Sequence, residues 1–390
     1  MKFVTQLLDR LQSRSSTRLA NGPHAPKPDV ATIIHDALTL AGLGTNTARG
    51  GQIAGVIDDA LARAGLLGRD GTPEAMPDQP PSVPAGVVQS VEDGMAVGKP
   101  SPGQFLSCTF ASATGTLAYK LYVPASYAVG SNAAVPLLVM LHGCTQTPDD
   151  FAAGTRMNAF ADLHGFLVAY PAQSANANGS KCWNWFRPQD QARGGGEPAL
   201  IAGMTAQVGA DYRVDPARIY VAGLSAGAAM AVVLGQTYPD VFAAVGAHSG
   251  LPYRAASDVG SAFAAMRGGA TRSPRAGLPG SGTVIPTIVF HGDLDNTVAV
   301  ANGDAIVAEQ TRFTGDSRPA STRDSGTAPG GRRYQRNTFV DAAGRLVVED
   351  WRVHGGGHAW MGGSASGSYT DPQGPDASAE MVRFFLQHAH

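Results

Sequence analysis

Hydrophobic residues follow two different patterns along this chain, and the change between them divides it. Before residue 67, apolar side chains recur every three or four positions in three segments, as Phe3, Leu7 and Leu11 do. This spacing predicts amphipathic helices over 1–67. Residues 68–100 contain six prolines and few large apolar side chains, so we expect an extended linker over 68–104.

Beyond the linker, short apolar runs alternate with helical patterns. The runs predict strands at 115–124, 136–141, 166–170, 218–222, 241–247, 285–290 and 346–353. Helical spacing predicts helices near 150–163, 198–209, 226–238, 300–311 and 376–388. Strands that alternate with helices indicate a mostly parallel sheet with helices on both faces. We therefore expect an α/β domain over 105–390, preceded by a helical N-terminal extension.

Composition narrows the classes of partner. Charged residues make up 15% of the chain and its net charge is −2, so no nucleic-acid-binding face is expected. No apolar run approaches the roughly 20 residues that a transmembrane helix needs. Asp9 and Arg10 interrupt the apolar N-terminal stretch, so no secretory signal is predicted. We expect a soluble protein of the cytoplasm, with an extracellular location as the alternative.

The clearest chemical motif is G-x-S-x-G at Gly223–Gly227, between a predicted strand and a predicted helix. This context is typical of the turn that carries a nucleophilic serine. Glycines allow close backbone approach there, and the start of the following helix directs N–H groups at developing negative charge. The motif predicts Ser225 as nucleophile, Ala226 as an oxyanion donor and Leu224 as a substrate contact.

A nucleophilic serine needs a base, and the base needs an orienting acid. Hydrolases of this type place the acid and then the histidine after the serine. Asp295 follows a predicted strand, so it lies at the carboxyl edge of the sheet, where such active sites form. His358 lies in a glycine-rich loop after the last predicted strand. Asp293 and His354 are the respective alternatives.

The remaining histidines do not predict a metal centre. His354 and His358 are four residues apart, but three glycines between them disfavour the helix that would put both on one face. His142 and His291 each precede a glycine at a predicted strand end and are interpreted as structural. We expect no metal and no cofactor.

The loop after the strand at 136–141 is where hydrolases place their second oxyanion N–H group. Either Cys144 or Thr145 would supply it. The chain has three cysteines, Cys108, Cys144 and Cys182. A bridge between Cys144 and Cys182 would hold an aromatic loop over the site, whereas a reducing cytoplasm favours free thiols. The sequence leaves this alternative open.

Three of the four tryptophans, Trp183, Trp185 and Trp360, lie next to proposed site elements. Large rings suit an apolar acyl or polyester chain, and ordinary core packing is the alternative. We predict that all three contact the substrate.

Together these motifs resemble the poly(3-hydroxybutyrate) depolymerase family of esterases. The similarity covers about 105–390. It rests on H-G-C-T-Q at 142–146, C-W-N-W at 182–185, G-L-S-A-G at 223–227, H-G-D-L-D-N-T-V at 291–298 and G-G-G-H-A-W at 355–360. Members are α/β-hydrolases that cleave short-chain polyhydroxyalkanoates or feruloyl and acetyl esters of polysaccharides. The resemblance implies this fold, with Ser225, Asp295 and His358 as the triad and Cys144 in the oxyanion loop.

The resemblance also implies a function. It suggests a serine esterase that cleaves poly(3-hydroxybutyrate)-like polyester or its oligomers through an acyl-enzyme. A feruloyl or acetylxylan-type carboxylesterase is the first alternative, and a non-catalytic protein of polymer granules is the second. The helical segment 1–67 resembles leaderless members that act on intracellular granules. We expect it either to dock on a granule surface or to pack on the hydrolase.

Overall fold

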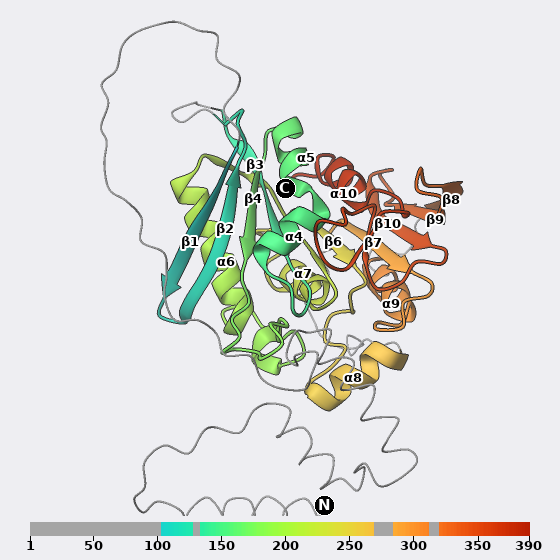
Figure 1. Cartoon of the computed structure of the whole chain (residues 1–390), viewed down its shortest axis with the longest axis horizontal. Helices are drawn as coiled ribbons and strands as arrows, with labels where there is room; N and C mark the ends of the chain where they lie inside the picture. The colour runs from blue at the N-terminus through green and yellow to red at the C-terminus, as the bar shows by residue number, and fades with distance from the viewer. Residues whose placement is uncertain (1–102, 128–132, 269–283, 312–319) are drawn as a thin grey trace, which may run out of the picture. The chain divides into compact units, whose positions relative to one another are not determined.

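The computed structural model describes residues 103–127, 133–268, 284–311 and 320–390. The predicted helices over 1–67 and nearly all of the linker lie outside these residues. Within them, one ten-stranded sheet has the order β1-β2-β4-β3-β5-β6-β7-β10-β9-β8 (Figure 1). The six strands from β4 to β10 run parallel, and antiparallel strands flank them on each side. The predicted α/β fold with a mostly parallel sheet is confirmed.

The elements follow the chain in a largely alternating order. The sheet strands are β1 (Gln104–Ser112), β2 (Gly115–Val123), β3 (Val135–Leu141), β4 (Leu167–Pro171), β5 (Val214–Leu224), β6 (Ala244–His248), β7 (Thr287–Gly292), β8 (Ala320–Thr327), β9 (Arg333–Val340) and β10 (Leu346–Val353). The short strands β11 (Trp360–Met361) and β12 (Thr370–Asp371) pair separately. The helices are α4 (Pro148–Thr155), α5 (Met157–His164), α6 (Gly196–Asp211), α7 (Ala226–Thr237), α8 (Val259–Gly268), α9 (Ala301–Thr311) and α10 (Ala377–Phe385), with the 3-10 turn η1 (Pro188–Gln191).

Strands β3 and β4 are apolar at every position because helices bury both faces of the sheet. Successive side chains of a strand point to opposite faces. In β3, Leu137 and Val139 pack in one core with α6, α7 and α9. Leu138 and Met140 pack in the other core with α4, α5 and α10. Figure 1 shows α4, α5 and α10 together on the near side of the sheet.

The single helix predicted near 150–163 is two helices. Thr147 caps the first turn of α4 by accepting from the Asp150 N–H group, and Pro148 follows the cap. Arg156 then adopts a left-handed conformation with φ 56°, which ends α4 and begins α5. One left-handed residue changes the direction of the chain without changing the three- and four-residue spacing of the apolar side chains. The sequence pattern therefore did not show the break.

The pattern also missed three strands of the main sheet, β1, β8 and β9, and the helix α8. Seven of the eight residues of β8 are exposed, because this strand forms the outer edge of the sheet. An edge strand buries little side-chain surface and therefore shows little apolar alternation. Local hydrophobicity consequently predicted the centre of the sheet and not its margins.

The packing of α10 on the sheet gives a stability prediction. Phe385 is 1% exposed, and its ring stacks on Tyr220 of β5 with 5.1 Å between centroids, whereas the adjacent Leu386 is 40% exposed. Phe385→Ala should lower the free energy of unfolding by about 3–5 kcal/mol. The control Leu386→Ala should lower it by less than about 1 kcal/mol. Urea unfolding monitored by circular dichroism measures both. Equal losses would show that α10 does not anchor on this face.

Candidate active site

Ser225 occupies the turn between β5 and α7 in a backbone conformation that side chains rarely adopt. Its φ is 58° and its ψ is −119°. Its N–H group donates to the carbonyl of His248, 2.9 Å away, and its own carbonyl accepts from the N–H group of Ala229. Such strain persists only where the surroundings determine it, and it is common at catalytic residues. The turn holds the serine at the carboxyl edge of the sheet.

The two motif glycines are required by close backbone contacts. A Cβ atom on Gly223 would lie 2.5 Å from the carbonyl carbon of Gly227. One on Gly227 would lie 2.1 Å from the carbonyl oxygen of Leu141 at the end of β3. Real Cβ atoms do not approach backbone so closely. The G-x-S-x-G spacing therefore allows β3, β5 and α7 to meet at Ser225.

Asp295 and His358 form a hydrogen-bonded pair beside this turn. Nδ1 of His358 lies 2.7 Å from Oδ2 of Asp295, and Oδ1 accepts from the N–H groups of Thr297 and Val298 at 2.9 and 2.8 Å. With Nδ1 donating to the carboxylate, Nε2 of His358 is left to accept a proton. His358 and Ser225 line the same pocket. The structure thus brings together the three residues that the sequence nominated as a triad.

The charge of Asp295 is stabilised by its neighbours. Burial alone would raise the pKa of Asp295, but hydrogen bonds from His291 and His358 and from the backbone outweigh burial and hold it below its ordinary value. His291 also lies with Nε2 2.8 Å from the carbonyl of Val298. Its placement fits the structural interpretation and adds a contact to Asp295 that the sequence did not predict.

The alternative residues form a pair of their own. Oδ2 of Asp293 lies 2.8 Å from Nδ1 of His354, and the N–H group of Gly355 donates to its other oxygen. Their side chains are 32% and 43% exposed, and neither lines the pocket that contains Ser225. The geometry therefore favours Asp295 and His358 for the triad.

The oxyanion loop leaves one N–H group for a substrate. Gly143 donates to Oε1 of Gln146 at 2.9 Å, and Thr145 donates to the carbonyl of Ser180 at 2.7 Å. The N–H group of Cys144, between them, has no acceptor among the described residues. Ala226 is the first residue of α7, and the N–H groups of a first helical turn have no partner within the helix. The geometry therefore favours Cys144 over Thr145 as the second oxyanion donor.

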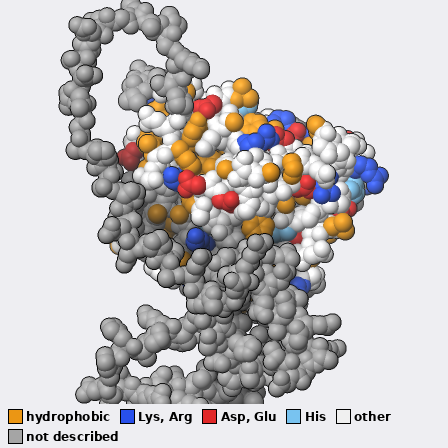
Figure 2. Space-filling model, in the orientation of Figure 1, with side chains coloured by type: hydrophobic (Ala, Val, Ile, Leu, Met, Phe, Trp, Pro, Cys, Tyr) orange, Lys and Arg blue, Asp and Glu red, His pale blue; other side chains and the backbone are white. Residues whose placement is uncertain are grey.

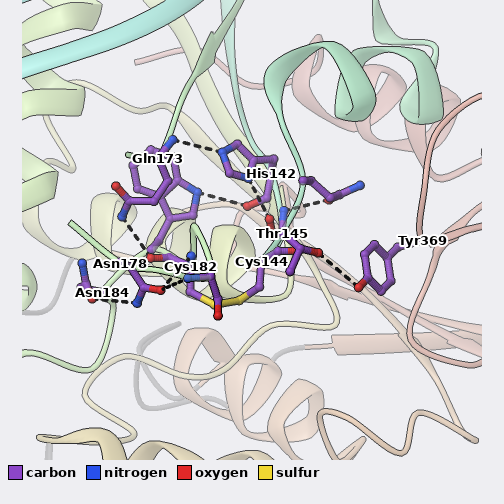
Figure 3. The surroundings of a disulfide bond; sticks show 12 residues. His142, Cys144, Thr145, Gln173, Asn178, Cys182, Asn184 and Tyr369 are labelled. Atoms are coloured by element: carbon purple, nitrogen blue, oxygen red, sulfur yellow. Dashed lines mark hydrogen bonds between the residues drawn. A yellow bond between two sulfur atoms is a disulfide. The ribbon is translucent and has the colours of Figure 1, made fainter. Parts of the chain in front are cut away.

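A disulfide bond joins Cys144 to Cys182 (Figure 3). Of the two alternatives that the sequence left open, the structure has the bridge and not two free thiols. The bond ties the oxyanion loop to the segment after β4. His142 reinforces this link, because its Nε2 accepts from the N–H group of Gln173 at 3.1 Å and its Nδ1 lies 2.7 Å from the carbonyl of Gly143. Burial lowers the pKa of His142 to about 4, so the ring is neutral and can accept.

The pocket at Ser225 has a volume of about 510 Å³ and is mainly apolar. Trp185 and Leu224, two of the residues that the sequence predicted as substrate contacts, line it. The sequence missed the contribution of α8, although its lining residues recur at helical spacing. Those residues are Val259, Ala262, Phe263 and Met266. The pocket suits a small apolar acyl group more than a charged ligand.

Trp183 and Trp360 do not line the pocket, contrary to the prediction that they contact substrate. They are 0% and 1% exposed. Nε1 of Trp183 donates to the carbonyl of His142 at 3.1 Å, and the ring of Trp360 packs edge-on against Phe151 with 5.4 Å between centroids. Both rings are buried in the core and pack against residues behind the site. Proximity to a motif in sequence did not distinguish these orientations.

The described residues contain no cluster of metal-ligating side chains. Among residues 103–127, 133–268, 284–311 and 320–390, no three His, Cys, Asp or Glu side chains are grouped to hold a metal ion. No helix in that part has the length and apolar character to cross a bilayer. On the face drawn in Figure 2, charged side chains of both signs are scattered among apolar and uncharged ones.

Comparisons with known proteins identify the family of this chain. A family model described as "Esterase PHB depolymerase" matches residues 117–331. The chain belongs to this family. Poly(3-hydroxyalkanoate) depolymerase C of Paucimonas lemoignei is 38% identical over 257 residues, which are 64% of this chain and 60% of that protein. Poly(3-hydroxybutyrate) depolymerase of Ralstonia pickettii is 29% identical over 263 residues, again 64% of this chain and 53% of that protein.

This chain thus matches between half and three-fifths of the length of these two relatives. Acetylxylan esterase A of Emericella nidulans is 35% identical over 155 residues, which are 39% of this chain and 49% of that protein. A solved acetyl xylan esterase from Aspergillus awamori superimposes with a TM-score of 0.56 at 19% identity, covering 74% of this chain and 100% of that one. This similarity shows a shared fold. The family resemblance inferred from the motifs is confirmed.

The two Asp–His pairs give a ranking of variants. Asp295→Asn should lower kcat for a soluble ester by about 10⁴-fold, because the amide disfavours the tautomer that leaves Nε2 of His358 as acceptor. Asp293→Asn should lower kcat by less than about fivefold, since an exposed ion pair contributes little. Steady-state kinetics with a p-nitrophenyl ester measures both. The reverse ranking would move the orienting acid to Asp293.

Proposed function

We propose that this protein is a serine esterase that hydrolyses poly(3-hydroxybutyrate)-like polyester or its oligomers. The proposal rests on one arrangement: Ser225 in a strained turn and His358, bonded to Asp295, line one apolar pocket. Membership of the esterase family supports ester hydrolysis. Two relatives named as polyhydroxyalkanoate and polyhydroxybutyrate depolymerases support a polyester substrate.

The geometry supports a two-step mechanism. Oγ of Ser225 attacks the ester carbonyl while Nε2 of His358 takes the serine proton. The N–H groups of Ala226 and Cys144 stabilise the oxyanion of the tetrahedral intermediate. As the intermediate collapses, His358 passes the proton to the departing alcohol and an acyl-enzyme forms. A water molecule then attacks the acyl carbonyl, with His358 as base, and releases the acid and free Ser225.

Asp295 stays ionised through both steps because its hydrogen bonds lower its pKa. It therefore stabilises the imidazolium form of His358 at each tetrahedral intermediate. The mechanism assigns every proton transfer to residues of the site. A non-catalytic granule protein would not need this arrangement, so we set that alternative aside.

A feruloyl or acetylxylan-type esterase is the second candidate. The relative from Emericella nidulans supports it. The aromatic rings of Trp185 and Phe186 line the pocket and could face an aromatic acyl group as well as an aliphatic one. A direct comparison of substrates therefore has to decide which acyl and alcohol groups the enzyme prefers.

We expect the full chain to hydrolyse amorphous poly(3-hydroxybutyrate) and its soluble oligomers faster than methyl ferulate or acetylated xylan. Ser225→Ala should lower every one of these activities by several orders of magnitude while the protein stays folded, because triad members act as a unit. Acid release by pH-stat and circular dichroism check both statements. Activity within tenfold of wild type would exclude Ser225 as nucleophile. Preference for acetylated xylan would favour the second candidate.

We further propose that segment 1–67 docks on the polymer surface through its apolar stripes. This part of the chain lies outside the described residues, and the proposal rests on its helical spacing alone. The chain divides into two units, Met1–Gly94 and Met95–His390, and all the site residues belong to the second unit.

A truncated chain that begins at Met95 should therefore keep its turnover of soluble esters and lose activity on polymer particles. Parallel assays on a p-nitrophenyl ester and on polymer suspensions measure the two activities. A joint fall of both activities with a lower melting temperature would show that the segment packs on the hydrolase instead. A loss of activity on polymer alone would show that ester cleavage does not need segment 1–67, whereas binding to the polymer does.

The disulfide bears on the compartment. The sequence led us to expect the cytoplasm, with an extracellular location as the alternative. Disulfides persist in oxidising compartments and are uncommon in the cytoplasm. Because Cys144–Cys182 joins two segments of the site, we propose that the protein works in an oxidising environment.

A further inference from the structure

We propose that Glu197 is a positioning residue for the oxyanion hole, acting through the segment 178–184 on Cys144. Glu197 lies in the first turn of α6 and does not line the pocket. The inference rests on the proposed esterase function. It assigns a role to a carboxylate that the triad does not use and that the sequence motifs did not single out.

The carboxylate of Glu197 is bound entirely by donors from two loop segments. Oε2 accepts from the backbone N–H group of Asn184 at 2.7 Å. Oε1 accepts from the side-chain amides of Asn184 and Gln173, both at 2.5 Å. Through these three bonds Glu197 fixes Asn184, the third residue of the C-W-N-W motif, and Gln173, two residues beyond the end of β4.

Those two segments are in turn bound to the residue that carries the disulfide. The amide nitrogen of Gln173 that donates to Glu197 also donates to the carbonyl of Cys182, at 3.0 Å. The side-chain oxygen of Asn184 accepts from Asn178, whose own oxygen accepts from the N–H group of Cys182 at 3.4 Å. Figure 3 shows these amides grouped around Cys182 on the side away from Tyr369.

Three direct links connect the segment 178–184 to the oxyanion loop. The first is the disulfide between Cys182 and Cys144. The second is the hydrogen bond from the N–H group of Thr145 to the carbonyl of Ser180 at 2.7 Å. The third is the bond from the indole of Trp183 to the carbonyl of His142. His142 before Cys144 and Thr145 after it are therefore both hydrogen-bonded to the segment 178–184.

An oxyanion donor of the backbone has no side chain with which to adjust its direction. Its orientation depends on the peptide planes around it, and those planes depend here on the three links. Loss of an oxyanion donor lowers kcat by about 10²–10³-fold, and misplacement by about 1 Å can cost about 10²-fold. A partial misalignment is expected to lower kcat by about tenfold.

The three donors around Glu197 favour its ionised form, although its burial opposes that form. Burial raises the pKa of Glu197 to about 7, with a smaller contribution from Asp190, whereas the bonds from Asn184 and Gln173 lower it. The start of α6 also favours a negative charge at this position. A glutamine would direct one NH₂ group at a neighbouring donor, so it would break part of the network at nearly constant volume.

The first test is Glu197→Gln in the full chain, assayed with a p-nitrophenyl ester below its melting temperature. We expect kcat to fall about tenfold with KM changed less than about twofold. Affinity for a boronic acid, whose adduct with Ser225 occupies the oxyanion hole, should fall by a similar factor. The control is Glu380→Gln, in the first turn of α10, where the carboxylate accepts from Arg383. This control should leave kcat unchanged.

The second test is a double-mutant cycle with Cys182→Ala. If Glu197 acts through the segment and its disulfide, the two substitutions together should lower kcat by clearly less than the product of their separate effects. Should Glu197→Gln not fold, Gln173→Ala replaces it, since this variant removes the bridge between Glu197 and Cys182.

The proposal would be overturned if the effects of Glu197→Gln and Cys182→Ala on kcat multiplied. It would also be overturned by a folded Glu197→Gln variant with wild-type kcat and boronate affinity. A rise in KM with unchanged kcat would also overturn it, because that pattern indicates a substrate contact. If the wild-type chain turns over no ester at all, the proposed function itself fails, and that result appears before any variant is made.

Discussion

The structure of the site depends on the backbone of Ser225, which is held at a positive φ where β3, β5 and α7 meet. A conformation of this kind costs about 1–3 kcal/mol and persists only where its surroundings determine it. Here the surroundings are the strand end at Leu141, the bond to His248 and the fully buried first turns of α7. The packing of the core offsets that cost, and the turn holds Ser225 at the edge of the sheet, where it lines the pocket.

Around this point, two buried imidazoles, those of His142 and His248, are neutral. Burial lowers the pKa of His142 to about 4 and that of His248 well below its ordinary value, and both rings serve as hydrogen-bond acceptors for backbone N–H groups. Asp295 is the exception, since its bonds outweigh its burial. The ionised carboxylate thus acts on His358 with little competition from other charges, which suits a base that must gain and lose a proton.

The oxyanion hole relies on a second kind of support. The proposed donors at Cys144 and Ala226 belong to different elements, so their alignment depends on how the loop after β3 is anchored relative to α7. The disulfide and the indole of Trp183 provide that anchor from the segment after β4, and Glu197 would hold the segment itself. Trp183 is buried for this reason, although its neighbour Trp185 reaches the pocket.

Local pattern in the sequence determined the central strands, the helices on both faces and the identity of Ser225, Asp295 and His358 as candidates. Each of these follows from residues within a few positions, whether a run buried on both faces or glycines around a serine. Only the tertiary structure bonded the N–H group of Thr145 to Ser180, paired Asp293 with His354, and turned Trp183 and Trp360 into the core. It also added α8 to the pocket and Glu197 to the support of the oxyanion loop. Those outcomes depend on contacts between residues far apart in the chain, and no short segment of sequence contains them.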